Sequence, residues 1–288
     1  MISRRMFMQG FLGSGIAVLS VGTYSRFLEP RWIELNRVTI KIDKLPQRFE
    51  GMTIAQMSDI HHCQYVPKEF IRRCVRKVNA LFPDVIVLTG DYVYYQNDTT
   101  STFLSPVANE LAGLKAKEGV FAVLGNHDNK DNTFISLSKA GIRVLINEHI
   151  PLCRKSDYLF IAGVDDLWRG RMDLDRTLKG TDDKPKILLA HNPDTIEMMK
   201  NKDVDFVISG HTHGGQVNLP LYGPPVIPSK FGARYISGLF REGDITMYVN
   251  KGIGLSGFPV RFRARPEITL FTLKRGRTED VINQGVWC

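Results

Sequence analysis

The chain has 288 residues, of which 43% are apolar and 24% charged; this is an ordinary globular composition and excludes wholesale disorder. Its length fits one large domain, and its four cysteines, without a C-x-x-C pair, indicate neither a disulfide scaffold nor a thiolate metal site. The net charge of +8 suits an anionic partner, such as a phosphate substrate, an acidic membrane surface or nucleic acid, but a solvated basic surface would give the same value.

The N-terminal segment differs from the rest of the chain. Arg4 and Arg5 directly precede a mostly apolar run over residues 6–24. This pattern resembles a twin-arginine export signal, and the run approaches the roughly 20 residues that span a bilayer. We expect residues 1–30 to be an export signal or an uncleaved membrane anchor, with a buried N-terminal helix as the competing interpretation. Residues 31–50 are expected to be a linker with the first strand.

Short β-rich runs alternate with helical stretches from Gly51 onward. The expected strands cover residues 52–57, 84–88, 120–124, 159–162, 187–190 and 205–208. Pro67 opens an expected helix, whose apolar stripe is Phe70, Ile71, Cys74 and Val78. A second helix is expected around residues 103–114.

The chain changes after Gly215 to short strands with Gly/Pro turns. Repeated strand–loop–helix units predict an α/β domain over residues 51–275, and the last part suggests added antiparallel strands. Residues 276–288 are expected to be a C-terminal tail.

Polar residues follow nearly every expected strand. They are Asp59, His61, Asp91, Asn126, His127, His191, His211 and His213. In open α/β sheets ligands bind beyond the carboxyl ends of the strands, so these side chains should meet at one site. A single such histidine would be assigned to packing, but five of the seven histidines lie in these positions. Converging charged and imidazole groups need a counter-ion, and a metal ion supplies it.

The motifs occur in an order that resembles one known family. Asp59-x-His61, Gly90-Asp91, Gly125-Asn126-His127-Asp128, His191 and Gly210-His211-Thr212-His213 are similar to the motifs of calcineurin-like metallophosphoesterases over about residues 51–273. His191-Asn192-Pro193-Asp194 and the Gly214-Gly215-Gln216 that follows His213 resemble the bacterial YkuE/YaeI-type branch. The resemblance implies an α/β fold of two central mixed β-sheets sandwiched by helices (α-β-β-α).

The resemblance also implies a cofactor of two divalent metal ions. Asp59, His61 and His213 would hold one ion, Asn126, His191 and His211 the other, and Asp91 would bridge both. Oxygen and nitrogen ligands without sulfur suit Mn, Fe or Zn and do not rank them.

His127 has no metal role in this scheme. The resemblance makes it the proton donor to the leaving group or a phosphate ligand, and a purely structural hydrogen bond is the alternative. Protein serine/threonine phosphatases of this superfamily have an acidic residue where this chain has Tyr94. That difference argues against a phosphoprotein phosphatase and leaves open which group orients His127. Asp128 is a candidate, but it would equally stabilise its own turn.

Three arginines alternate in the last part of the domain. On a strand, Arg261, Arg263 and Arg265 would share one face. One interpretation is a wall that binds a diphosphate or a lipid headgroup, with Arg261 and Arg265 as candidate substrate-binding residues. The other is a solvated edge strand protected by its charge.

The expected function is hydrolysis of a phosphodiester or diphosphate bond by a metal-activated hydroxide. The substrate would be a phosphate-containing small molecule or lipid. The enzyme would be exported or membrane-anchored in the periplasm or cell envelope, with the twin-arginine export machinery as a partner. A UDP-2,3-diacylglucosamine pyrophosphatase of lipid A synthesis is an alternative that would place the site on the cytoplasmic face of the inner membrane.

Two further alternatives are a nuclease within this fold and a non-catalytic metal-binding protein. The sequence contains no helix-turn-helix, zinc-finger or RNP-like motif, so nucleic acid is not the expected partner.

Overall fold

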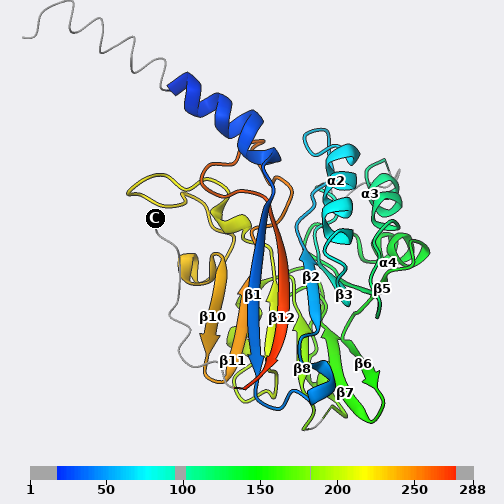
Figure 1. Cartoon of the computed structure of the whole chain (residues 1–288). Helices are drawn as coiled ribbons and strands as arrows, with labels where there is room; N and C mark the ends of the chain where they lie inside the picture. Colours follow the sequence, from blue (N-terminus) through cyan, green and yellow to red (C-terminus); the bar gives the residue numbers. More distant parts are fainter. Residues whose placement is uncertain (1–17, 95–101, 182, 277–288) are drawn as a thin grey trace, which may run out of the picture.

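Two mixed β-sheets form the centre of the molecule (Figure 1). The computed structural model describes residues 18–94, 102–181 and 183–276. The first six-stranded sheet has the order β1-β12-β2-β3-β4-β5, and the second has the order β10-β11-β9-β8-β7-β6.

The first sheet joins the two ends of the described chain. Its strands are β1 (Glu34–Ile42), β2 (Thr53–Met57), β3 (Val85–Thr89), β4 (Val120–Val123), β5 (Arg143–Val144) and β12 (Glu267–Arg275). β2 to β5 are parallel, whereas β12 is antiparallel to β2 and parallel to β1. β1 and β12 therefore lie side by side, in blue and red in Figure 1.

The second sheet has a parallel centre and antiparallel edges. Its strands are β6 (Glu148–Arg154), β7 (Asp157–Gly163), β8 (Lys186–Leu189), β9 (Phe206–Ser209), β10 (Gly238–Glu242) and β11 (Ile245–Val249). β7, β8, β9 and β11 are parallel, and β6 and β10 are antiparallel to their neighbours. Antiparallel pairing after Gly215 is thus found for β10 and β12, but β11 joins its sheet in the parallel direction.

Helices cover the outer faces of both sheets. The first sheet carries α2 (Lys68–Asn79), α3 (Leu104–Leu111) and α4 (Lys130–Lys139), and the second carries α5 (Leu174–Leu178), η4 (Pro193–Met198) and η6 (Gly232–Tyr235). In α2 the buried side chains are Ile71, Cys74, Val75 and Val78, close to the expected stripe. Each fully buried aliphatic side chain contributes roughly 1.5–3 kcal/mol to stability.

Alternating side chains on the strands divide the core into layers. Val85 and Val87 of β3 pack between the sheets, where Ile187 of β8 also lies. Ile86 and Leu88 of β3 point instead to the helices of the first sheet, as the two-residue period of a strand requires. The α-β-β-α architecture expected from the sequence is confirmed.

The N-terminal helix projects from one end of the molecule (Figure 1). Residues 18–31 are helical, and Val18 and Leu19 are exposed. The described part of the apolar run is therefore not buried in the domain. Arg4, Arg5 and nearly all of the expected tail lie outside the described residues. In the part of the chain that the structure describes, no helix has the length and apolar character needed to cross a membrane.

Candidate metal centre

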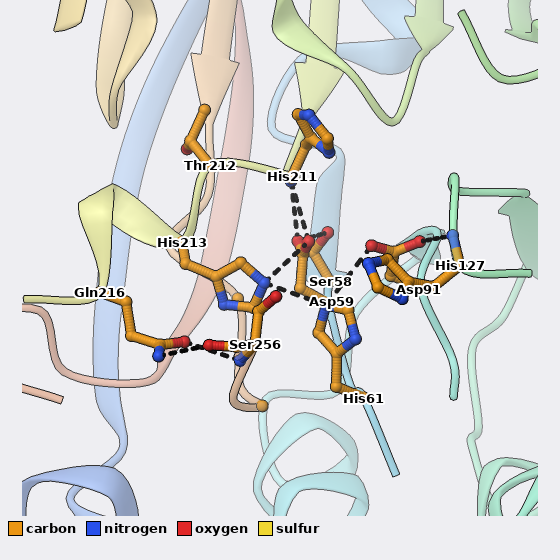
Figure 2. Close-up of polar contacts among 12 residues, drawn as sticks. Ser58, Asp59, His61, Asp91, His127, His211, Thr212, His213, Gln216 and Ser256 are labelled. Atoms are coloured by element: carbon orange, nitrogen blue, oxygen red, sulfur yellow. Dashed lines mark hydrogen bonds and ion pairs between the residues drawn. The ribbon is translucent and has the colours of Figure 1, made fainter. Parts of the chain in front are cut away.

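The polar residues that follow the strands meet at one edge of the two sheets, as Figure 2 shows for several of them. Loops after β2, β3 and β4 in the first sheet and after β8 and β9 in the second carry Asp59, His61, Asp91, Asn126, His127, His191, His211 and His213. Except for Asn126 and His127, which are half-buried, these side chains are buried. The structure thus brings together all the residues expected at the metal centre.

One group of possible ligands contains Asp59, His61 and His213. The Nε2 atoms of His61 and His213 are 3.0 Å apart, and His213 Nε2 lies 3.5 Å from Asp59 Oδ1. One ligand atom from each of the three residues fits within 4.8 Å of the others, so the group could hold a metal ion.

A second group contains Asp91, His191 and His211. His211 Nδ1 lies 3.1 Å from His191 Nε2, which is 3.3 Å from Asp91 Oδ2. These three residues also offer ligand atoms within 4.8 Å of one another. Asn126 joins them, because its Oδ1 atom is 3.1 Å from His191 Nε2.

The Asp91 carboxylate lies between the two groups. Its Oδ2 atom is 3.4 Å from His61 Nε2 and 3.3 Å from His191 Nε2, while its Oδ1 atom accepts a hydrogen bond from the main-chain N–H of His127. A Cβ atom at Gly125 would lie 2.2 Å from Asp91 Oδ1, so only glycine fits beside this carboxylate.

The charge of the cluster calls for a cation. Burial acts to lower the pKa of His191, but the nearby carboxylates of Asp91, Asp59 and Asp166 raise it to about 10. The buried anions therefore draw a proton into the centre, where a metal ion would supply the same positive charge. Burial lowers the pKa of His61 and of His211 to about 3, which keeps both rings neutral and able to act as ligands. The donor set of oxygen and nitrogen atoms fits divalent metal ions.

Several of these residues have an unusual backbone conformation. Positive φ angles occur at Asp59 (50°), His61 (45°), Asp91 (56°), His211 (74°) and His213 (54°). A residue other than glycine in the left-handed region costs about 1–3 kcal/mol, and such residues concentrate at functional sites. The main-chain N–H of His211 donates to both carboxylate oxygens of Asp59, at 3.0 Å, which helps to hold this conformation.

The main chain orients His127. Its Nδ1 atom lies 2.8 Å from the carbonyl oxygen of Tyr94 and donates a hydrogen bond to it. The Tyr94 ring also stacks on the His127 ring, with centroids 5.5 Å apart. Asp128 instead accepts hydrogen bonds from the main-chain N–H groups of Gly125, Asp91 and Tyr92. Of the two roles considered for Asp128, the structure favours stabilisation of the turn.

Arg261 has a different environment from the one expected for a substrate-binding residue. Residues 260–265 form no strand; a single bridge joins Phe262 to Val217, and Arg263 interrupts the alternation with a φ of 55°. Arg261 is completely buried, and its guanidinium donates to the carbonyl oxygens of residues 251, 252, 254 and 264. One of its nitrogen atoms lies 3.3 Å from His213 Nδ1. The expectation that the three arginines share one face of a strand is therefore wrong. The Arg261 guanidinium instead lies against the Nδ1 side of the His213 ring.

Arg265 lies apart from Arg261. Its guanidinium carbon is 3.7 Å from the centroid of the Trp32 ring, a cation–π contact at the base of the N-terminal helix. This contact does not place Arg265 at the metal centre.

Trp168 is a neighbour of the centre that the sequence reasoning did not identify. Its ring meets the His211 ring edge-on, with centroids 4.5 Å apart and an angle of 88°. The turn that holds it depends on Asp166, whose Oδ1 accepts from the N–H groups of Trp168 and Arg169. Asp166 thus stabilises the turn that holds Trp168 beside the centre. The tryptophan gave no sequence signal because it follows no strand directly.

Comparison with known proteins agrees with this geometry. Residues 52–215 match the family model for calcineurin-like phosphoesterases. The uncharacterized metallophosphoesterase YkuE of Bacillus subtilis is 37% identical over 283 residues, covering 95% of this chain and 98% of the relative. Phosphodiesterase YaeI of Escherichia coli is 33% identical over 279 residues, with 95% and 100% covered. The UDP-2,3-diacylglucosamine pyrophosphatase LpxG of Chlamydia muridarum is 28% identical over 331 residues, with 90% and 97% covered.

These comparisons confirm the family that the motifs resemble. They also confirm the general class of reaction, metal-dependent hydrolysis of a phosphoric ester. Acidic and imidazole side chains meet at the strand ends in the order that the resemblance required, and the matching relatives span nearly the whole chain. This chain belongs to the calcineurin-like phosphoesterase family and is a metal-dependent phosphoric ester hydrolase.

Proposed function

We propose that the protein hydrolyses a phosphodiester or diphosphate bond at the cell envelope with two divalent metal ions. Asp59, His61 and His213 would hold one ion, Asn126, His191 and His211 the second, and Asp91 would contact both. The observation that carries the proposal is the position of Asp91 Oδ2, 3.4 Å from a histidine of one group and 3.3 Å from a histidine of the other. A carboxylate shared in this way suits a pair of metal ions.

Metal ions bound here would lower the pKa of a water molecule and neutralise phosphoryl oxygens. The chain itself supplies the proton for the leaving group. Because His127 Nδ1 donates to the Tyr94 carbonyl oxygen, its Nε2 atom is the one that exchanges a proton. Protonated at Nε2, His127 would give that proton to the departing oxygen and would regain it from solvent.

The proposed bond type is supported by the relatives and by Tyr94. YaeI is named a phosphodiesterase and LpxG a pyrophosphatase. Tyr94 stands where phosphoprotein phosphatases of the superfamily have an acid, which disfavours a phosphoprotein substrate. A diester or diphosphate of a small molecule or a lipid agrees with both points.

The proposed location is outside the cytoplasm, by twin-arginine export or through an uncleaved anchor. Arg4, Arg5 and the apolar run at residues 6–24 support it. The likeness to LpxG favours a second candidate, a UDP-2,3-diacylglucosamine pyrophosphatase on the cytoplasmic face of the inner membrane. An alkaline phosphatase fusion to the C-terminus, which is active only after export, separates these two locations.

The reaction is tested with the purified full-length protein, stripped by a chelator and reloaded with Mn²⁺, Zn²⁺ or Fe²⁺. Substrates are bis-p-nitrophenyl phosphate, p-nitrophenyl phosphate and a lipid diphosphate. We expect the diester or the diphosphate to be cleaved fastest. The Asp91→Asn variant should lose both activity and metal content. Absence of hydrolysis with every metal would overturn the proposal.

A further inference from the structure

Large apolar side chains are exposed on two loops near the metal centre. Leu221 is 111% exposed, Tyr222 80%, Val226 74% and Phe258 79%. They lie on the loops of residues 217–231 and 256–263, and we call these four side chains the apolar rim. Soluble proteins rarely expose several large apolar side chains on neighbouring loops, so the exposure of these four indicates a binding partner.

Hydrogen bonds join the two loops beside the proposed metal ligands. The Gln216 side chain donates to the carbonyl oxygens of Ser256 and Phe258 and accepts from the N–H of Ser256. Val217 pairs with Phe262. Gln216 directly follows η5 (His213–Gly215), and Figure 2 shows its side chain with Ser256 beside His213. The apolar rim therefore belongs to the same end of the molecule as the metal centre.

The N-terminal helix docks on the second of these loops. The carbonyl oxygen of Ser25 accepts a hydrogen bond from the Arg261 N–H at 2.9 Å. The buried carboxylate of Glu29 accepts from the Ala264 N–H at 2.6 Å. In Figure 1 this helix, in blue, projects from the end of the molecule that carries the yellow and orange loops. The described part of the apolar run, residues 18–24, thus leads into the fold beside the apolar rim.

The tip of the first loop has a residue type that is unusual for its backbone conformation. Leu219 and Gly223 pair across it, and Leu221 at the tip has a φ of 64°. Glycine or asparagine is the ordinary choice for that conformation in a solvated turn. A leucine in that conformation is strained, and its fully exposed side chain gains no packing within the described chain.

The charge of the two loops indicates the chemical class of the binding partner. Residues 217–231 and 256–263 contain no Asp or Glu, and Lys230 and Arg263 are exposed on them. Apolar side chains flanked by basic ones suit the interface of an anionic bilayer. A bilayer also accounts for the exposed Val18 and Leu19 of the N-terminal helix, which projects from the same end of the molecule.

We propose that the apolar rim lies in the interface of an anionic lipid bilayer, with the metal centre facing the membrane. This position of the apolar rim, which rests on the proposed hydrolase function, assigns the substrate class. The substrate is a phosphodiester or diphosphate whose apolar part stays in the bilayer during cleavage. The loops of residues 217–231 and 256–263 then form a second membrane contact, distinct from the N-terminal run.

The contact is tested by placing a probe at the tip of the first loop. In a Cys153→Ser, Cys288→Ser background, Leu221→Cys carries an NBD fluorophore on the full-length protein bound to phosphatidylcholine–phosphatidylglycerol vesicles. The background alone corrects for labelling of Cys63 and Cys74, which are buried. The matched control is Phe82→Cys, because Phe82 is 81% exposed and lies between α2 and β3, where the parallel strands begin.

Spin-labelled lipids should quench the fluorophore at residue 221 severalfold more than the one at residue 82. Equal quenching at the two positions, or none at residue 221, would overturn the proposal. Protection of residue 221 that depends on protein concentration, without quenching by lipid, would assign the apolar rim to a second copy of the chain and would also overturn it. This measurement needs no catalysis, so it stands even if the proposed function fails.

An activity measurement tests the assigned substrate class. The Leu221→Ser, Phe258→Ser double variant is compared with Phe82→Ser on a methylumbelliferyl phosphodiester of diacylglycerol in vesicles and on water-soluble bis-methylumbelliferyl phosphate. We expect the double variant to lose about tenfold or more on the vesicle substrate, since burial of such side chains exceeds the ~1.4 kcal/mol equivalent to a tenfold change. Its activity on the soluble diester should be unchanged. Equal activity of both variants on vesicles would overturn the substrate class, whereas a parent inactive on both substrates would count against the proposed function alone.

Discussion

The Nδ1 atom of His127 lies 2.8 Å from the main-chain carbonyl oxygen of Tyr94 and donates a hydrogen bond to it. The main-chain N–H of His127 donates a second hydrogen bond, to Asp91 Oδ1 at 2.8 Å. His127 is therefore held at both its main-chain N–H and its Nδ1 atom, which leaves Nε2 for the proton transfer that we propose. The group that orients the histidine is the main-chain carbonyl of Tyr94. It accepts the hydrogen bond at a position whose side chain is not acidic.

The first prediction concerns the leaving group. His127→Ala should lower kcat by about 10²–10⁴-fold for a diester with an alkyl leaving group, because general acid catalysis is worth that much. The loss should be much smaller for p-nitrophenolate, which departs without a proton. Metal content measured by mass spectrometry should not change. Equal losses with both leaving groups would show that His127 binds the phosphate instead of protonating the leaving oxygen.

The second prediction separates the Tyr94 main chain from its side chain. Tyr94→Phe keeps the carbonyl oxygen and the ring that stacks on His127, so kcat should stay near that of the parent protein. Tyr94→Ala removes the stacking, which is worth about 0.5–1.5 kcal/mol, and should cost no more than about tenfold in kcat. Steady-state kinetics on the alkyl diester give both values. A collapse of the Phe variant to the level of His127→Ala would refute the carbonyl as the orienting group.

The grouping of the candidate metal ligands could be predicted from the sequence because its signal lies in residue type and position. Asp59, Asp91 and His211 each follow a buried β-rich run, and parallel strands bring such ends together. The Tyr94 carbonyl gave no such signal, because every residue has a carbonyl group. Arg261 was misplaced because its alternation with Arg263 suggested a strand, whereas the positive φ of Arg263 turns the chain.

Elements at the edges of the fold also lacked a pattern from which they could be predicted. The six strands that were assigned residue ranges were found within one or two residues, since each is a short apolar run bounded by polar residues. The buried strands β11 and β12 were expected only as short strands after Gly215, without bounds. α4 has only two buried side chains, Thr133 and Leu137, so it lacks the apolar stripe that identified α2. β5 spans only Arg143–Val144, which is too short for any periodicity to be visible.

The third prediction links metal binding to pH through His191. Burial opposes protonation, but Asp91, Asp59 and Asp166 raise the pKa of His191 to about 10 in the metal-free site. A metal ion must therefore displace this proton, and the apparent metal affinity should rise from neutral pH toward pH 10. Isothermal titration calorimetry in buffers of different ionisation enthalpy should detect about one released proton. Affinity that falls over this pH range would contradict the assignment of His191 as a ligand.

The fourth prediction concerns metal removal. Five residues of the centre hold positive φ angles and two groups of buried side chains meet there, so we expect bound ions to stabilise the folded state. If ions are resident as proposed, chelation should lower the melting temperature, since a ligand at 100 times its Kd stabilises a protein by about 2.7 kcal/mol. Differential scanning calorimetry with and without EDTA measures the shift. Asp91→Asn is the control and should respond little to the chelator; an unchanged melting temperature of the parent would argue against resident metal ions.

The fifth prediction distinguishes the roles of Arg261 and Arg265. Arg261 is completely buried and its guanidinium donates to four main-chain carbonyl oxygens around His213. Arg261→Met should leave those carbonyl groups without a donor, at about 1–3 kcal/mol for each group that water cannot reach. The variant should therefore unfold at a lower urea concentration and hold less metal. Arg265→Met loses only a cation–π contact with Trp32, worth about 0.5–2 kcal/mol, and should keep its metal content. If Arg261→Met instead kept its stability and raised only KM, Arg261 would have the substrate-binding role that the alternating sequence first suggested.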